Sequence, residues 1–360
     1  MFKFFLFGKS KKYLGIDIGT SSIKIVEISR SKNKINLDNY GEKINRINEE
    51  ELQNNLRTRT FFLSEEEIAD NIKEILKEAE IKTKEAIFSV PDFMSFFTVL
   101  TMPWLPKNEI ASVVNFEAKQ YIPLPLKDIN LDWLLIEEKE NKNKRSKELK
   151  ILLAAVPNKT ILKYQRVANL AGISLLSIEA EIFSLIRASI KKEETARVIQ
   201  LIDFGIQSTT IAIVEGGSLQ LAYSIDFSNN ENIAHLASGL NINYNEAEEI
   251  IKRKGLIDNQ TGPLMKLKVD DLISESKQIA NNFFRNEKKE VEKIIFAGGP
   301  ALTPGLLEYF SEKTGKKVEI VNPFFNISYP PILEEKIKEI GPRYSVAVGL
   351  SLREINNKSK

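Results

Sequence analysis

The sequence contains no cysteine and a single histidine, His235. Without cysteine the chain can form no disulfide, no thiolate zinc site and no cysteine nucleophile. One histidine leaves almost no room for histidine-based acid–base catalysis. A metal ion bound by this chain is therefore expected to be a hard, oxygen-coordinated one such as magnesium. Because His235 has no recognisable catalytic partner in the sequence, we expect it to have a structural role.

Long apolar runs are also missing, and neither sign of charge dominates. No stretch approaches the roughly 20 apolar residues of a membrane-spanning helix, so we expect a cytoplasmic protein rather than an integral membrane protein. The 51 basic and 49 acidic residues are interspersed and leave a net charge of +2, which predicts no nucleic-acid partner. The aromatic residues 2–8 are too few for a signal peptide. They form either a docked strand or turn, or a membrane-surface contact.

Two segments of the chain resemble each other, residues 12–27 and 200–215. Each reads as an apolar strand, an Asp-x-Gly turn, several hydroxyl residues and a second apolar strand. The 360 residues suffice for two lobes, and 186 positions separate Asp17 from Asp203, so each copy begins one half. A single Asp-x-Gly turn is commonly an ordinary hairpin turn. The matching pair instead predicts two turns that face one polyphosphate across a cleft, and therefore a nucleotide.

The residue types in the two turns suit a phosphate chain with bound magnesium. A glycine after the aspartate lets the backbone approach a phosphate, and successive amides there can form an anion-binding nest. Hydroxyl side chains and the ammonium of Lys24 supply further donors, while Asp17 and Asp203 would hold magnesium through water. The predicted phosphate-binding residues are Gly19, Thr20, Ser21, Ser22, Lys24, Gly205, Ser208 and Thr209, with Thr210 as a further hydroxyl.

Two later features have a binding interpretation and an ordinary one. Gly298 and Gly299, in a strand–turn–helix pattern, either let the backbone lie flush against an adenine and ribose or form a plain connection. Glu249 and Lys252, three positions apart on one helix face, either grip the ribose and the base edge or form a surface ion pair. The residues alone leave both alternatives open.

Hydrophobic periodicity and turn residues predict alternating strands and helices. One helix begins at Ser64, with Glu67 completing a capping box, and another begins with Thr303 as N-cap and Pro304 at the first position. Residues 86–172 read as strand, helix, strand, strand, helix, which suggests a subdomain inserted in the first lobe. The other predicted elements are irregular strands and a loop over 37–62, strands over 131–137 and 150–156 joined by a solvated tip at 138–148, and helices over 178–190, 233–240, 244–254, 269–289 and 344–355.

Three motifs stand in the order of a known superfamily. Residues 15–24, the Asp203-Phe204-Gly205 turn and residues 297–301 resemble the phosphate-1, phosphate-2 and adenosine motifs of the actin, Hsp70 and sugar kinase superfamily. Within it the chain resembles the PilM family of type IV pilus assembly, a relative of the division protein FtsA. Further matching segments are 117–123, 131–133, 154–157, 322–324 and 346–350. The resemblance covers essentially the whole chain. It implies an α/β, actin-like (ribonuclease H-like) two-lobed ATPase fold with an inserted subdomain in the first lobe.

The resemblance also implies ligands, partners and a division of the chain. ATP and magnesium would bind in the cleft, with at most slow hydrolysis. PilM-like proteins bind the cytoplasmic N-terminal peptide of the inner-membrane protein PilN beside the inserted subdomain. The implied partners are therefore a PilN-like peptide and pilus motor ATPases, at the cytoplasmic face of the inner membrane. The implied parts are the first lobe with the phosphate-1 hairpin (1–85), the inserted peptide-docking subdomain (86–172), a connecting helix (173–199), the second lobe with the phosphate-2 hairpin (200–232), its helical subdomain (233–292), the adenosine motif (293–340) and a C-terminal helix returning to the first lobe (341–360).

Several residues depart from the family pattern or leave a choice open. Residues 223–230 stand where the family usually has a basic residue and two glycines, and the helix with Lys252 leaves the acidic residue as either Glu248 or Glu249. No residue is clearly placed to orient an attacking water, although Gln207 lies near the second turn. In the inserted segment, the apolar residues that line either a peptide groove or the core are Trp104, Leu105 and Leu124.

The alternative function is that of an FtsA-like, membrane-associated polymerising ATPase of cell division. That class anchors through a C-terminal amphipathic helix. Residues 351–360 turn polar and show no apolar face, which disfavours this alternative.

The two aspartates give the nucleotide interpretation a direct test. If both hold magnesium, Asp17→Ala and Asp203→Ala should each weaken magnesium-ATP binding about tenfold, a loss of about 1.4 kcal/mol. Isothermal titration calorimetry measures both affinities. Unchanged affinity in both variants refutes the interpretation.

Overall fold

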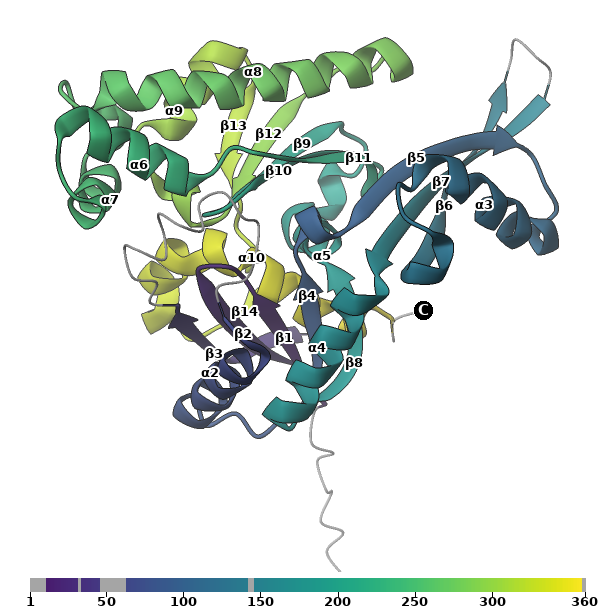
Figure 1. The fold of residues 1–360 in the computed structure, drawn as a ribbon, viewed down its shortest axis with the longest axis horizontal. Coiled ribbons are helices and arrows are strands. Elements are labelled where there is room, and N and C mark those ends of the chain that lie inside the picture. Colours follow the sequence, from purple (N-terminus) through teal and green to yellow (C-terminus); the bar gives the residue numbers. More distant parts are fainter. Residues whose placement is uncertain (1–10, 32–33, 46–62, 142–145, 358–360) are drawn as a thin grey trace, which may run out of the picture.

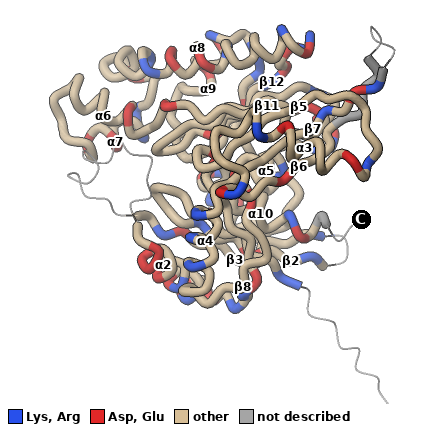
Figure 2. The backbone as a smooth tube through the Cα atoms, turned by 45° about the vertical axis from the view of Figure 1, so that its right-hand side comes forward, with Lys and Arg blue, Asp and Glu red and all other residues tan. Residues whose placement is uncertain are grey.

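A computed structural model describes residues 11–31, 34–45, 63–141 and 146–357. Two lobes, each built on its own mixed sheet, stack on one another, and a third sheet projects to one side (Figure 1). Basic and acidic residues are distributed over the helices of both lobes (Figure 2). Among the described residues, no helix is both long and apolar enough to cross a bilayer. The aromatic segment at residues 2–8 lies outside the described residues.

The first lobe is built on a six-stranded sheet in the order β14-β3-β2-β1-β4-β8. Its strands are β1 (Lys12–Ile18), β2 (Ser22–Ser31), β3 (Lys34–Ile44), β4 (Glu85–Val90), β8 (Ser174–Ala180) and β14 (Ile327–Ser328). Helices α2 (Glu65–Glu78) and α4 (Asn158–Ala171) pack on one face, and α10 (Glu334–Asn357) packs on the other. The predicted capping box at Ser64 and Glu67 is present at the start of α2.

The second lobe repeats the pattern of the first around a five-stranded sheet, β11-β10-β9-β12-β13. In each lobe an antiparallel meander, β1–β2–β3 or β9–β10–β11, is followed by a strand parallel to the first, β4 or β12. The internal resemblance in the sequence is therefore an architectural repeat. The strands are β9 (Ile199–Phe204), β10 (Thr209–Glu215), β11 (Ser218–Ile225), β12 (Lys293–Ala297) and β13 (Lys317–Ile320); the helices are α6 (Asn229–Leu240), α7 (Tyr244–Arg253), α8 (Gly262–Glu287) and α9 (Leu306–Thr314).

A three-stranded sheet, β5-β7-β6, with helix α3 on one face forms the projecting part of Figure 1. Its elements are β5 (Phe96–Pro103), α3 (Lys107–Tyr121), β6 (Ile129–Asn141) and β7 (Ser146–Pro157). The predicted segment 86–172 is divided by the fold, since β4 pairs between β1 and β8, and α4 packs on α2. We therefore propose that the inserted subdomain spans only residues 96–157.

Small residues let α10 approach the first lobe closely. A Cβ on Gly15 would lie 2.1 Å from the carbonyl oxygen of Ala347, and one on Gly349 would lie 1.9 Å from that of Ser184 in α5 (Glu181–Ser189). Close packing of this helix was expected from the sequence. Its expected start at residue 344 is wrong, because α10 already begins at Glu334 and continues through Pro342.

Other local expectations differ from the structure, for physical reasons. Residues 174–180 form β8, so the helix expected from 178 begins only at Glu181; pairing with β4 overrides the helical pattern. Thr303 is not an N-cap, because the turn Gly299–Leu302 is a short 3-10 helix and α9 begins after the left-handed Gly305. Residues 34–44 form one strand, whose pairing with β2 shifts register between Leu37 and Asn39, as expected of an irregular strand. Residues 46–62 lie outside the described residues. The β6–β7 ladder continues into the charged segment 138–148.

Short 3-10 helices link several of these elements. They are η1 (Asp92–Met94), η2 (Leu126–Asp128), η3 (Lys192–Glu194), η4 (Gly255–Ile257), η5 (Gly299–Leu302) and η6 (Pro331–Leu333).

Candidate functional site

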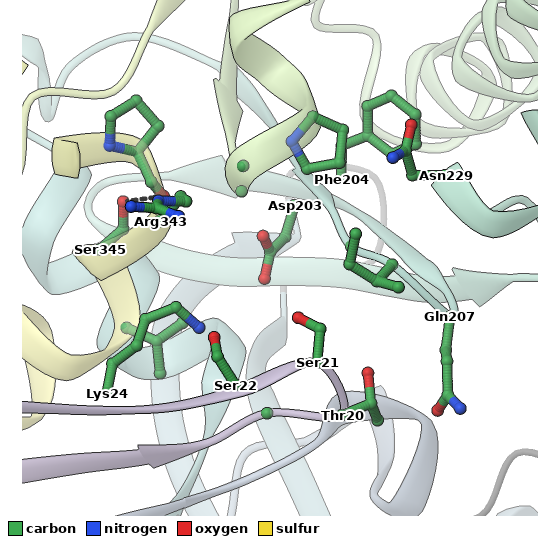
Figure 3. A pocket seen from close by; sticks show the side chains of 18 of the residues that line it. Thr20, Ser21, Ser22, Lys24, Asp203, Phe204, Gln207, Asn229, Arg343 and Ser345 are labelled. Atoms are coloured by element: carbon green, nitrogen blue, oxygen red, sulfur yellow. Dashed lines mark hydrogen bonds between the residues drawn. The ribbon is translucent and has the colours of Figure 1, made fainter. Parts of the chain in front are cut away.

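A cavity of about 840 Å³ lies between the two lobes, a size typical of small-molecule sites. Both hairpin turns and the glycine turn after β12 line it (Figure 3). The predicted site residues that line this one cavity are Asp17, Gly19, Thr20, Ser21, Ser22, Lys24, Asp203, Gly205, Ser208, Lys252, Gly298 and Gly299. Gln207, noted for its closeness to the second turn, also lines it. Residues nearly two hundred positions apart thus face a common space, as the paired motifs predicted.

The two Asp-x-Gly turns have the same backbone geometry. The amide of Gly19 donates to the carbonyl oxygen of Ser22 at 3.1 Å, and the amide of Gly205 donates to that of Ser208 at 3.1 Å. A Cβ on Gly205 would lie 2.6 Å from the Ser208 oxygen, so glycine is the residue that this turn accommodates. The equivalence means that each lobe presents its turn to the cavity in the same manner.

Asp17 is the residue before the last of β1 and is held by neighbours on the first sheet. The hydroxyl of Ser89 donates to Asp17 Oδ1 at 2.9 Å and accepts the amide of Ile18 at 3.1 Å. Lys24 Nζ lies 3.5 Å from Asp17 Oδ2, and both side chains are buried. The carboxylate is therefore fixed in place, and the lysine ammonium lies beside the position that the phosphates are expected to occupy.

Asp203 is the residue before the last of β9 and extends into the cavity toward Ser21 and Ser22 in Figure 3. Burial, together with the negative charge of Asp17, raises the pKa of Asp203 to about 6, while Lys24 opposes that rise. Gly298 adjoins it, since a Cβ there would lie 3.3 Å from Asp203 Oδ1 and 2.1 Å from the carbonyl oxygen of Phe204. The close approach of β12 to β9 thus requires glycine at this position.

Two predicted site residues lie outside the cavity lining. Thr209 is fully buried and its hydroxyl donates to the carbonyl oxygen of Phe227 at 2.7 Å, while its neighbour Thr210 lines the cavity. Glu249 Oε2 lies 3.5 Å from Arg253 Nε, and its Oε1 lies 3.8 Å from Lys252 Nζ, the surface ion pair that the sequence left as the alternative. The cavity is lined instead by Glu248, the alternative left open by the sequence, with its Oε1 3.1 Å from Lys252 Nζ.

Glu181 and Asp92 form an acidic pair that sequence reasoning missed. Asp92 Oδ1 accepts the amide of Ile182 at 3.0 Å and so caps α5, while the amide of Asp92 donates to Glu181 Oε2 at 3.3 Å. Burial and the nearby charges of Asp17, Asp92 and Asp203 raise the pKa of Glu181 well above its usual range. Burial raises the pKa of Asp92 to about 7. Asp92 follows the end of β4, which the sequence predicted as a strand, so its position could have been noticed. Glu181 follows β8, which the sequence did not predict as a strand.

A polar chain connects the first turn to the glycine turn. Ser22 Oγ donates to Glu42 Oε1 at 2.9 Å, and an Arg343 guanidinium nitrogen lies 3.2 Å from Glu42 Oε2. The aliphatic part of Arg343 lies against Gly299. Glu42 and Arg343 were also missed, because β3 and α10 meet only in the folded chain.

The segment 223–230, which departs from the family pattern, contacts the second turn. Helix α6 starts at Asn229 with Ser228 as its cap, and the Asn229 and Asn230 amides donate to the carbonyl oxygens of Gly205 and Ile206. Asn229 also lines the cavity, so backbone contacts take the place of the glycines expected there. His235 lies further along α6, outside the cavity lining.

The set of side chains fits a magnesium-bound nucleotide. In the described part of the chain, no three histidine, aspartate or glutamate side chains converge closely enough to hold a metal ion by themselves. Magnesium typically uses one or two carboxylates and completes its shell with water and substrate phosphates. Asp17 and Asp203 can supply those carboxylates, while the turn amides and Lys24 can contact phosphate oxygens.

Asp203 makes the stability of the protein without ligand depend on pH. Its pKa of about 6 exceeds the ordinary 3.8, so between these values the folded protein binds a proton that the unfolded chain releases. Wild-type protein therefore loses stability relative to Asp203→Asn as the pH rises from about 4 to about 6. Scanning calorimetry measures this difference in melting temperature, with Asp271→Asn on α8 as the control. A difference that is the same at every pH contradicts the assignment.

Comparison with known proteins identifies the family and the fold. The chain matches the family model described as type IV pilus assembly protein PilM over residues 15–355. It is similar to the structure of a PilM–PilN type IV pilus biogenesis complex, with 22% identity, a TM-score of 0.79 and coverage of 95% of this chain and 98% of that chain.

Two further solved structures share the fold. One is the ethanolamine utilization protein EutJ from Carboxydothermus hydrogenoformans, with 15% identity, a TM-score of 0.53 and coverage of 95% and 89%. The other is MreB5 of Spiroplasma citri bound to ADP, with 14% identity, a TM-score of 0.52 and coverage of 97% and 98%. The fold is thus the actin-like ATPase fold expected from the sequence motifs. The family match takes in both hairpin turns, the inserted subdomain and most of α10, and the chain belongs to the PilM family of type IV pilus assembly proteins.

Proposed function

We propose that this protein is an ATP- and magnesium-binding scaffold of type IV pilus assembly that docks the cytoplasmic N-terminal peptide of a PilN-like inner-membrane protein. The observation that carries the nucleotide part is the pair of equivalent turns that face each other across one cavity. In this proposal the scaffold works at the cytoplasmic face of the inner membrane, held there by its partner, and pilus motor ATPases are further partners.

The residues of the cavity divide into three roles. Asp17 and Asp203 hold the hydrated magnesium ion, and the backbone amides of the two turns, with Lys24, hold the phosphates. Gly298 and Gly299 leave room for the adenosine, while Glu248 and Lys252 bond to the ribose and the base edge. Bound magnesium would neutralise the phosphate charge and relieve the repulsion between the two aspartates.

As the family resemblance implies, we expect turnover to be slow at most. Glu181 lines the cavity and is a carboxylate that could act as a general base toward water. Burial and the nearby charges of Asp17, Asp92 and Asp203 raise its pKa well above the usual range.

The apolar surface between the inserted subdomain and the first lobe supports the docking part. Asn158 Nδ2 donates to the carbonyl oxygen of Lys127 at 2.9 Å, which places the turn η2 beside the start of α4. Leu124, which precedes η2, is 45% exposed, and Leu162 on α4 is 52% exposed. Of the other two residues considered for a groove, Trp104 is exposed at the opposite end of α3 and Leu105 packs on the subdomain core. The homologous fold of a PilM–PilN complex makes a PilN-like peptide the occupant that we propose.

Adjacent glutamates on α7 test the nucleotide part. Glu248→Gln should weaken ATP binding about tenfold, about 1.4 kcal/mol, because a neutral amide oxygen is a weaker acceptor than a carboxylate. Glu249→Gln, one position away and outside the cavity lining, should bind ATP as the wild type does. Calorimetric titration of both variants with magnesium-ATP decides the matter. Equal losses in the two variants, or no loss in either, would contradict the proposed contact of Glu248 with the nucleoside.

A peptide titration tests the docking part. A fluorescent synthetic peptide with the N-terminal cytoplasmic sequence of the PilN-like protein should bind the full chain. The variant Leu162→Asp should weaken this binding at least tenfold, about 1.4 kcal/mol, because it puts a charge into an apolar contact. Leu267→Asp is the matched control, since Leu267 is an exposed leucine on α8 in the other lobe. Absence of binding to the wild type in the presence of magnesium-ATP would end the docking proposal.

A further inference from the structure

Helix α8 connects the helices beside the cavity to the inserted subdomain. It has 26 residues and so is about 39 Å long. One of its ends lies near α6 and α7, and the other reaches toward the upper ends of β5 and β7 (Figure 1). The residues of α8 do not line the cavity themselves, so α8 meets it through α7, whose Ile251 does line it.

The beginning of α8 packs near α7, the helix whose Glu248 and Lys252 are proposed to contact the ribose and the base. Ile251 of α7 lines the cavity and shares a core cluster with Met265 and Val269 of α8. The link between the two helices is closely packed, because a Cβ on Gly255 would lie 2.2 Å from the carbonyl oxygen of Pro304, and one on Gly262 would lie 2.5 Å from that of Leu256. We therefore expect α8 to follow a shift of α7.

The end of α8 is joined to the inserted subdomain by an ion pair. Glu287, its last residue, lies 2.7 Å from Lys150 of β7, and the two side chains are only 22% and 11% exposed. The pair borders a second cavity of about 490 Å³ between β5, β7, β11 and α8, lined in part by Thr98, Gln220 and Asn286. Removing one partner of a buried pair leaves an uncompensated charge, so the pair favours one fixed arrangement of subdomain and helix.

The first lobe holds the subdomain through contacts of a different kind. The chain enters it after Pro91 and leaves it at Pro157, and Phe97 of β5 packs edge-to-face on Phe183 of α5 at 5.5 Å between ring centroids. Phe97, Val99 and Leu152 of the subdomain also share one apolar cluster with residues of β9, β10 and β11, so the second lobe holds the subdomain by apolar packing as well. A charged hydrogen bond is more directional than such packing, so the ion pair fixes the orientation of the subdomain relative to α8.

We propose that α8 couples the inserted subdomain to the second lobe through the Lys150–Glu287 pair, so that the subdomain moves with the second lobe when nucleotide closes the cavity. This inference rests on the proposed nucleotide function. It makes the subdomain surface sense the nucleotide, and by linkage it makes a peptide docked there change the affinity for nucleotide by the same factor.

The absence of cysteine allows the motion to be measured with pairs of introduced spin labels. The three label sites are exposed and lie on the first lobe, the subdomain and the second lobe: Lys77→Cys on α2, Asn115→Cys on α3 and Gln278→Cys on α8. Pulsed electron–electron double resonance measures the distance between each pair of labels with and without magnesium-ATP. We expect the α2–α8 and α2–α3 distances to shift and the α3–α8 distance to stay constant.

Removing the ion pair should loosen the subdomain from the second lobe. The double variant Lys150→Met/Glu287→Gln removes both charges, so that neither is left buried alone. The apolar contacts with the second lobe remain, so the expected change is that the α3–α8 distance, constant in the wild type, shifts when magnesium-ATP binds. The matched control is Lys289→Met/Glu215→Gln, which breaks an ion pair between the chain just after α8 and β10 within the second lobe. The control should behave as the wild type does.

The outcomes separate this inference from the proposed function. If calorimetry shows no binding of magnesium-ATP, the proposed function fails and the coupling fails with it. If ATP binds but the α3–α8 distance shifts in the wild type, or no distance changes, only the coupling is overturned. Identical responses in the Lys150/Glu287 variant and the wild type also overturn it.

Discussion

The structure depends on the placement of two carboxylates from different sheets in one enclosed space. Asp17 and Asp203 are the residues before the last of β1 and β9, and burial, together with the charge of Asp17, raises the pKa of Asp203. Like charges at close range in a buried site are unfavourable unless a cation or a proton lies between them. A hydrogen bond from Ser89 and the proximity of Lys24 hold Asp17 in place without neutralising Asp203. A site of this kind is ready to bind a metal ion together with an anionic ligand, and the two lobes are arranged around it.

The repeated architecture explains how that placement arises. In each lobe the first strand of a meander ends in an Asp-x-Gly turn whose glycine amide bonds back to a serine carbonyl. In each lobe a parallel strand, β4 or β12, lies on the other side of that first strand. Two copies facing each other bring two equivalent turns to one cavity. The family to which the chain belongs, and the fold that it shares with an ADP-bound MreB, agree with this arrangement.

Much of this was predictable from the sequence, and the exceptions have identifiable causes. Short-range patterns predicted both hairpin turns and the capping box of α2, because the signal lies within a few residues of the element. Features that depend on long-range pairing were not predictable. Strand β8 was mistaken for helix because only its pairing with β4 makes it a strand. Glu42 and Glu181 line the cavity, but the elements that carry them meet the other site residues only in the folded chain. Thr209 and Thr210 are neighbours on β10 whose side chains point in opposite directions, so only Thr210 lines the cavity.

The inserted subdomain carries the exposed Leu124, and the Lys150–Glu287 ion pair joins this subdomain to α8 of the second lobe. The most direct test of the central claim is a crystal structure of the full chain with manganese, in place of magnesium, and a non-hydrolysable ATP analogue. The anomalous signal of manganese locates the metal. The account predicts manganese between Asp17 and Asp203, with phosphate oxygens at the Gly19 and Gly205 turns. Manganese near neither aspartate, or an analogue bound outside the cavity between the lobes, would contradict it.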